Sequence, residues 1–63
     1  MTATQALKVF TFGRDVRLPN GKNGTVVGSS LGREFGRLIL YVKCSFEGKE
    51  KTWPHYDFPA ANE

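Results

Sequence analysis

The sequence predicts an all-β fold, a small barrel of four to five antiparallel strands with one short 3₁₀ turn near the C-terminus. Two observations carry this prediction. Residues 13–28 alternate apolar and charged side chains, break at 19–21 and resume with β-branched residues, which is the pattern of strand, tight loop and strand. Residues 37–46 alternate again over the longest stretch of the chain. No segment has the periodicity of a helix of useful length.

The length and composition limit the class of protein. The chain has 63 residues, enough for one domain that buries roughly 60% of its unfolded surface. A single cysteine, Cys44, allows no intrachain disulfide, and a single histidine, His55, leaves no ligand set for a structural zinc ion. Stability is therefore expected to come from dense packing of the aromatic residues or from self-association. No metal or cofactor is expected.

The domain is expected to span residues 7–59. Residues 1–6 are small and polar and predict a flexible leader, and residues 60–63 predict a flexible tail. Residues 7–12 form a short run with high β propensity and predict the first strand. Residues 14–18 predict the next strand.

The middle of the chain is rich in glycine. Residues 19–24 predict a turn, because Asn and Gly tolerate a positive φ. Residues 25–29 predict the third strand. Residues 28–36 contain three glycines and predict a flexible connection.

Residues 37–46 predict the clearest strand. A period of two places one face in the core and the other against solvent or a partner. The odd-numbered positions are polar or amphipathic, except for Ile39. The apolar positions are Leu38, Leu40, Val42, Cys44 and Phe46.

The last predicted strand and a turn follow. A connection at 47–49 leads to a strand at 50–53, which Pro54 ends because proline has no N–H to donate to a ladder. Residues 55–59 predict one 3₁₀ turn, with Phe58 folded back onto the core.

This layout resembles the SH3-like small barrels. Residues 21–27, Gly-Lys-Asn-Gly-Thr-Val-Val, resemble the core of the KOW motif, and KOW proteins typically bind RNA, ribosomes or RNA polymerase. The layout is also similar to that of the plasmid-borne type II dihydrofolate reductases, through Gly-Arg-Asp-Val-Arg at 13–17, Gly-Thr-Val-Val-Gly at 24–28 and Lys-Thr-Trp-Pro at 51–54. The reductase active-site sequence Val-Gln-Ile-Tyr has no counterpart here. The resemblance therefore implies a fold and an association through strand edges, without a reductase site.

No catalytic residue is predicted. His55 is close to Tyr56 and Asp57, but in so tight a turn these side chains are expected to cap the turn rather than to perform acid–base chemistry. Cys44, on the apolar face of a strand, is expected to be an inert buried thiol. Strands rather than a helix follow the glycines at 21, 24, 28 and 32, which favours turns over a phosphate-binding loop.

The candidate binding residues are basic and aromatic. Alternation places Arg37, Tyr41 and Lys43 on one face of their strand. It also places Lys51 and Trp53 on one face of the next strand. We take the two faces together as one surface, with a core position as the alternative for Trp53. Such surfaces stack on and neutralise single-stranded nucleic acid, and the same residue types are enriched at protein-binding hot spots. The full candidate set is Arg17, Lys22, Arg33, Arg37, Tyr41, Lys43, Lys51 and Trp53.

The predicted function is that of a small non-enzymatic binding module or regulator. The net charge is +3 and the isoelectric point is about 9.4, which suits an acidic partner. The favoured partner is a protein in a nucleic-acid-associated complex, as for a phage or mobile-element regulator of a host protein. The alternatives are direct binding of single-stranded nucleic acid or RNA, and a homo-oligomeric enzyme with a site between subunits.

The expected location is cytoplasmic. The N-terminus lacks a basic stretch followed by an apolar run, and no apolar segment approaches the ~20 residues of a membrane span. No membrane partner is expected.

Overall fold

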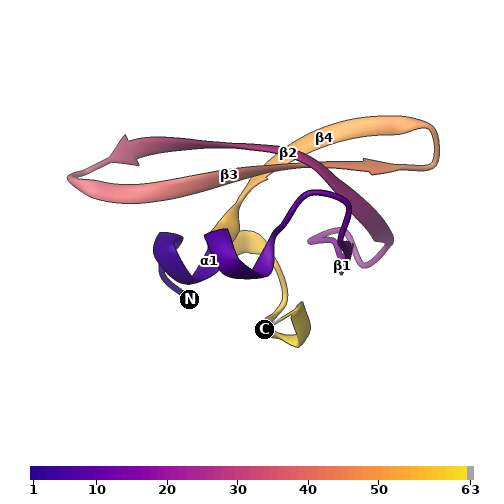
Figure 1. Ribbon diagram of the computed structural model, residues 1–63, viewed down its shortest axis with the longest axis horizontal. Coiled ribbons are helices and arrows are strands. Elements are labelled where there is room, and N and C mark those ends of the chain that lie inside the picture. Colours follow the sequence, from indigo (N-terminus) through magenta and orange to yellow (C-terminus); the bar gives the residue numbers. More distant parts are fainter. Residues whose placement is uncertain (63) are drawn as a thin grey trace.

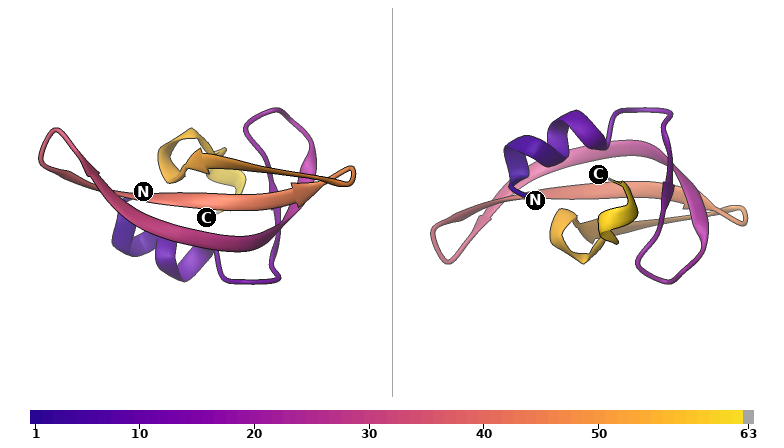
Figure 2. Two further views of the ribbon diagram at one scale, coloured as in Figure 1. Left: turned by 90° about the horizontal axis from the view of Figure 1, so that it is seen from above. Right: turned by 90° about the horizontal axis from the view of Figure 1, so that it is seen from below.

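The structure, a computed structural model, describes residues 1–62. Its four strands form one antiparallel sheet in chain order, which curls into a half-barrel (Figures 1 and 2). This architecture confirms the predicted all-β class and is compatible with an SH3-like barrel. The strands are β1 (Asp15–Arg17), β2 (Asn23–Glu34), β3 (Arg37–Phe46) and β4 (Lys49–Pro54), and helix α1 (Ala3–Val9) and the 3₁₀ turns η1 (His55–Asp57) and η2 (Ala60–Asn62) accompany them.

The central strand β3 has the predicted bounds. It pairs with β2 along its length up to Ser45 and with β4 from Tyr41 to Phe46. Both hairpins turn over two residues, and φ is positive at both turn positions: 51° at Phe35 and 75° at Gly36, then 49° at Glu47 and 75° at Gly48. Type I′ turns have this signature, and their twist matches that of the strands they join.

Strand β2 is longer than the sequence predicts. The expected flexible connection at 28–36 is wrong, because β2 continues to Glu34 and shifts register once, between Val26 and Gly28. Gly and Ser disfavour strands in isolation. Here pairing with the strongly alternating β3 and the tight turn at its end outweigh that preference.

The N-terminal segment is a helix where the sequence predicts a flexible leader and then a strand at 7–12. Its first turn closes with a capping box. The Gln5 N–H donates to Thr2 Oγ1 at 3.1 Å, and the Thr2 N–H donates to Gln5 Oε1 at 2.8 Å. Ala3 and Ala6 face the core, so this segment belongs to the folded domain.

The core lies between the sheet and the elements on one side of it (Figure 1). The side chains of Leu18, Val26, Leu40, Val42 and Cys44 are fully buried, and Ala3, Ala6, Phe10, Val16, Trp53 and Phe58 join them in one cluster. The Phe58 ring packs 4.6 Å from that of Phe10 and 6.0 Å from that of Trp53, between ring centroids. The sequence-based expectation that Phe58 folds back onto the core is thus confirmed.

Within the stretch for which the sequence predicts a flexible tail, residues 60–62 form the 3₁₀ turn η2; Glu63 lies outside the described residues. Asn62 is buried. The Arg17 N–H donates to Asn62 Oδ1 and Asn62 Nδ2 donates to the Arg17 carbonyl, both at 2.8 Å. These are the two bonds that a neighbouring strand would make, so Asn62 covers the outer edge of β1. Arg14 adds bonds to the Val9 and Asn62 carbonyls, at 2.7 and 3.2 Å.

Substitution of two leucines on the same face of β3 can test where the core ends. Leu40 is 1% exposed and Leu38 is 43% exposed. We expect Leu40→Ala to lower the free energy of unfolding by about 2–5 kcal/mol, because it opens a cavity, and Leu38→Ala by less than about 1 kcal/mol. Urea denaturation measures both, with Leu40→Val as a milder variant that should lose about 1 kcal/mol. Equal losses for the two alanine variants would contradict this core boundary.

Candidate protein-binding surface

The candidate binding residues do not share one face. The register of the β3–β4 hairpin places Lys51 opposite Cys44 and Trp53 opposite Val42. Directly opposed residues project from the same side of a sheet. Lys51 and Trp53 therefore project from the core side, while Tyr41 and Lys43 project from the other side, and the single surface expected from the sequence is not formed.

Trp53 is a core residue. It is 9% exposed, and its ring centroid lies 5.8 Å from that of Phe46. Lys51 is exposed and places its Nζ 5.4 Å from the centre of the Trp53 ring, where a cation is attracted to the π-face. Trp53 is thus part of the core packing, and Lys51 lies over the face of its ring.

Several of the other basic candidates are spread out and paired. Lys22 forms an ion pair with Glu47 at 2.9 Å, and Lys43 one with Glu50 at 3.3 Å. Arg17 lies on β1, next to Asn62. Arg33 and Arg37 both lie near the β2–β3 turn, where the register directs them to opposite faces, and neither has an ion-pair partner within residues 1–62. The predicted basic residues therefore form no continuous basic surface.

Part of the β2–β3 hairpin extends beyond the rest of the sheet. Strand β1 pairs only with residues 23–25 of β2, and β4 ends opposite Tyr41. Residues 31–40, which we call the outlying hairpin, therefore form a two-stranded ribbon at one end of the molecule (Figures 1 and 2).

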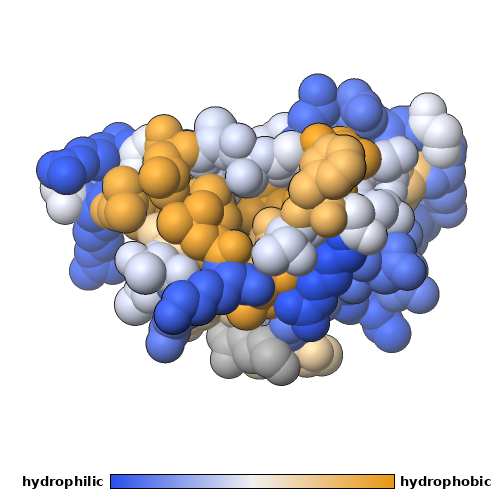
Figure 3. All heavy atoms as spheres, viewed as in Figure 1, coloured by the Kyte–Doolittle hydropathy of each residue, from blue (hydrophilic) through white to orange (hydrophobic). Residues whose placement is uncertain are grey.

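The outlying hairpin exposes large apolar side chains. Leu31 lies opposite Leu40 and Leu38 opposite Arg33, so Leu31 and Leu38 are diagonal neighbours on the side of the sheet that carries the core. Leu31 is 53% exposed and Phe35, at the turn, is fully exposed. Figure 3, seen from the same side as Figure 1, shows apolar side chains gathered where the hairpin passes over α1.

Phe35 has an unfavourable backbone conformation for its type. Its φ of 51° lies in the left-handed region, where Asn and Gly are far more common than a bulky residue. Neither folding nor burial explains an aromatic ring at this position, since the side chain contacts nothing that would hide it from water. Glu47 has the same backbone conformation at the other turn, so the exposed aromatic ring, rather than the backbone, distinguishes Phe35.

The opposite face of the outlying hairpin is braced by Tyr41. A Cβ added to Gly32 would lie 2.8 Å from Tyr41 Cε2, so any larger residue would force the ring to move from this position. The Tyr41 hydroxyl then donates to Glu34 Oε1 at 2.7 Å. This hydrogen bond to a carboxylate, more than any other effect, raises the pKa of Tyr41. Tyr41 therefore supports the hairpin, in addition to its predicted place among the binding residues.

His55 and Cys44, whose side chains can act in catalysis, have structural positions here. His55 is buried, and its Nδ1 accepts the Leu40 N–H at 3.1 Å; the imidazole thus continues the sheet where β4 ends and does not cap its own turn. Cys44 is buried, and burial raises its pKa to about 11. Among residues 1–62 no group of three potential metal ligands is found.

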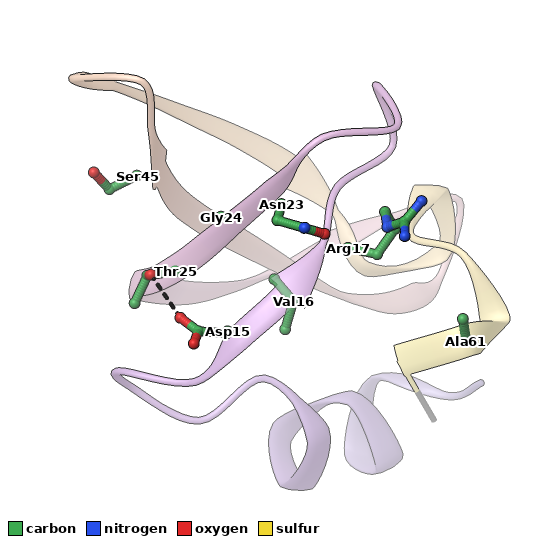
Figure 4. Close-up of a pocket in the computed structure, with 8 residues that line it drawn as sticks. All are labelled: Asp15, Val16, Arg17, Asn23, Gly24, Thr25, Ser45 and Ala61. Carbon is green, nitrogen blue, oxygen red and sulfur yellow. Dashed lines mark hydrogen bonds between the residues drawn. The ribbon is translucent and has the colours of Figure 1, made fainter.

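The end of the molecule that carries β1 has an open hollow of about 690 Å³ (Figure 4). Asp15 is the one carboxylate among its described lining residues, and Thr25 Oγ1 donates to Asp15 Oδ1 at 3.0 Å. Arg17 also lines it. A carboxylate that already has a hydrogen-bond donor, with no second acid or base beside it, is not the arrangement of an acid–base site.

No protein-family model matches the chain, and no curated protein and no solved structure matches it. In the described part of the chain no helix is long and apolar enough to cross a membrane. The geometry of the outlying hairpin is thus the basis for a functional assignment. Sequence reasoning missed Leu31 and Phe35, although a residue followed by glycine between two strands, here Phe35-Gly36, is a hairpin signal.

The Tyr41–Glu34 contact has a measurable signature. We expect Glu34→Gln to lower the pKa of Tyr41 toward its ordinary value, because an ionised phenol would no longer face a carboxylate. A pH titration followed by the NMR signals of the tyrosine rings measures the change, with Glu47→Gln as a matched control far from the ring. An unchanged Tyr41 pKa in Glu34→Gln would show that the contact is not made in solution.

Proposed function

We propose that this protein is a non-enzymatic binding module that docks onto a protein partner through the outlying hairpin. The observation that carries the proposal is the exposure of Leu31, Phe35 and Leu38 on one protruding ribbon. Large apolar side chains gathered on a surface are typical of protein interaction sites. An aromatic anchor flanked by arginines matches the residue types that contribute most to binding.

The preorganised conformation of the outlying hairpin also supports a role in binding. The tight turn and the Tyr41 brace hold the part of the ribbon that extends beyond Leu40, its last residue in the core cluster. A preformed binding element loses less conformational freedom when its partner binds, which leaves more of the interaction energy for affinity.

The basic residues favour a protein over a nucleic acid as the direct ligand. Nucleic-acid platforms place cations and aromatic rings along one continuous groove, whereas Lys22 and Lys43 are engaged with carboxylates and Trp53 is buried. The KOW-like segment at 21–27 keeps nucleic-acid-associated complexes as the expected setting of the partner. The proposal thus describes a small regulator of such a complex, acting in the cytoplasm.

The test is capture from cell lysate by the tagged full chain, with and without nuclease, quantified by mass spectrometry. We expect Phe35→Ser to reduce capture of the specific partner by about tenfold or more, as for a hot-spot anchor. The matched control is Phe12→Ser, because Phe12 is also an exposed phenylalanine, 82% accessible, outside the hairpin. Capture by Phe12→Ser should be unchanged.

Two results would contradict the proposal. One is equal capture by the wild-type chain and Phe35→Ser, which would remove the hairpin from the interface. The other is capture that disappears with nuclease for every protein recovered, which would point to direct nucleic-acid binding.

A further inference from the structure

One edge of β3 is open beside the outlying hairpin. Strand β4 ends opposite Tyr41, and the next N–H on that side, that of Leu40, is accepted by His55. In an antiparallel strand the N–H and C=O of every second residue point to the same side. The backbone groups of Leu38 therefore point to the same edge as those of Leu40, and no strand of the described chain lies there.

The turn geometry gives the same orientation independently. In a two-residue hairpin the residues that flank the turn, here Glu34 and Arg37, bond to each other. The next residue of β3, Leu38, then directs its N–H and C=O away from β2.

A hollow of about 480 Å³ lies along this edge. Its walls come from Arg37, Leu38 and Ile39 of β3, from His55 and Tyr56 of η1, and from residues 1–4. Leu38 and Tyr56 are exposed at its rim, and Ile39 is buried in its wall. The hollow can take an apolar side chain from a segment that lies along β3.

The charged residue that lines the hollow at the open edge is Arg37. Arg33 lies across β3 from this edge, on β2 and opposite Leu38. Glu34 lies opposite Arg37 on the same face, and its carboxylate accepts a hydrogen bond from the Tyr41 hydroxyl rather than forming an ion pair with Arg37. Neither arginine has an ion-pair partner within residues 1–62, so a carboxylate of a bound segment would complement Arg37.

We infer that the partner contributes an extended acidic segment, which adds to β3 as a strand at Leu38. Its backbone bonds to the N–H and C=O of Leu38, an apolar side chain enters the hollow, and a carboxylate pairs with Arg37. Addition of a strand at a free sheet edge is an established mode of peptide recognition, in which backbone bonds supply affinity and side-chain pockets supply specificity. This inference rests on the proposed function and names the chemistry of the partner.

The experiment selects binders from a displayed library of random peptides, each of about ten residues, on the immobilised full chain. We expect the enriched peptides to alternate acidic and apolar residues. Titration of a labelled enriched peptide should show binding weakened about tenfold or more by Arg37→Glu. Lys49→Glu, the same charge reversal at the far turn of the sheet, should change it less than about twofold.

Two measurements test the backbone contact. Leu38→Pro removes the outward N–H, which β2 does not use, and should weaken binding about tenfold or more, since it deletes a bond that strand addition requires. If that variant fails to fold, amide hydrogen exchange in the wild-type chain tests the backbone contact instead. The Leu38 amide should exchange at least about tenfold more slowly when the peptide saturates the protein.

Three results would overturn the inference: no enriched peptide, enriched peptides without acidic residues, or a Leu38 amide whose exchange the peptide leaves unchanged. If, at the same time, Phe35→Ser abolishes capture of a protein partner, the proposed function stands and only the mode of binding is wrong. If Phe35→Ser also captures normally, both the inference and the proposed function fail.

Discussion

The rest of the structure depends on a mismatch between the size of the core and the length of the β2–β3 pair. A chain of 63 residues gathers one small cluster of buried side chains, and along β3 that cluster stops at Leu40. Beyond that boundary the two strands stay paired for another three residues each before the turn. Only Ile39 is buried in this continuation, and Leu31, Phe35 and Leu38 are left exposed.

An isolated two-stranded ribbon is only marginally stable in water, so the outlying hairpin needs local support. Three features supply it: a turn whose twist suits the strands, the packing of Tyr41 on Gly32, and the hydrogen bond from Tyr41 to Glu34. None of them requires the apolar face of the ribbon. That face is left available for a partner, and Arg37 at the adjacent open edge favours a partner segment with negative charge.

The elements with strong local patterns could be predicted from the sequence. The alternation at 37–46 gave β3 its correct bounds, and Pro54 with the residues after it gave the 3₁₀ turn. The helix could also have been recognised, because Thr2 and Gln5 have the spacing of a capping box. It was missed because a seven-residue helix is too short for a clear apolar period.

Other features depend on contacts between distant parts of the chain. The polar and glycine-rich half of β2 is a strand only because β3 pairs with it. Asn62 has a defined role only because β1 lies beside it. By contrast, the side of the sheet from which Lys51 and Trp53 project follows from the two-residue turn at Glu47 and Gly48, because the turn fixes the register. The longer connection predicted from the sequence at 47–49 does not give this register.

The central claim is that the outlying hairpin is already formed in the free protein. The most direct measurement is NMR of the unbound chain, with nuclear Overhauser contacts recorded between Hα atoms across the hairpin. The account predicts contacts between Leu31 and Leu40 and between Arg33 and Leu38, because these pairs face each other without mutual hydrogen bonds and lie closest in the ladder. Random-coil chemical shifts and no cross-strand contacts at residues 31–40 would contradict it, and the exposed side chains would then belong to a disordered loop rather than to a docking surface.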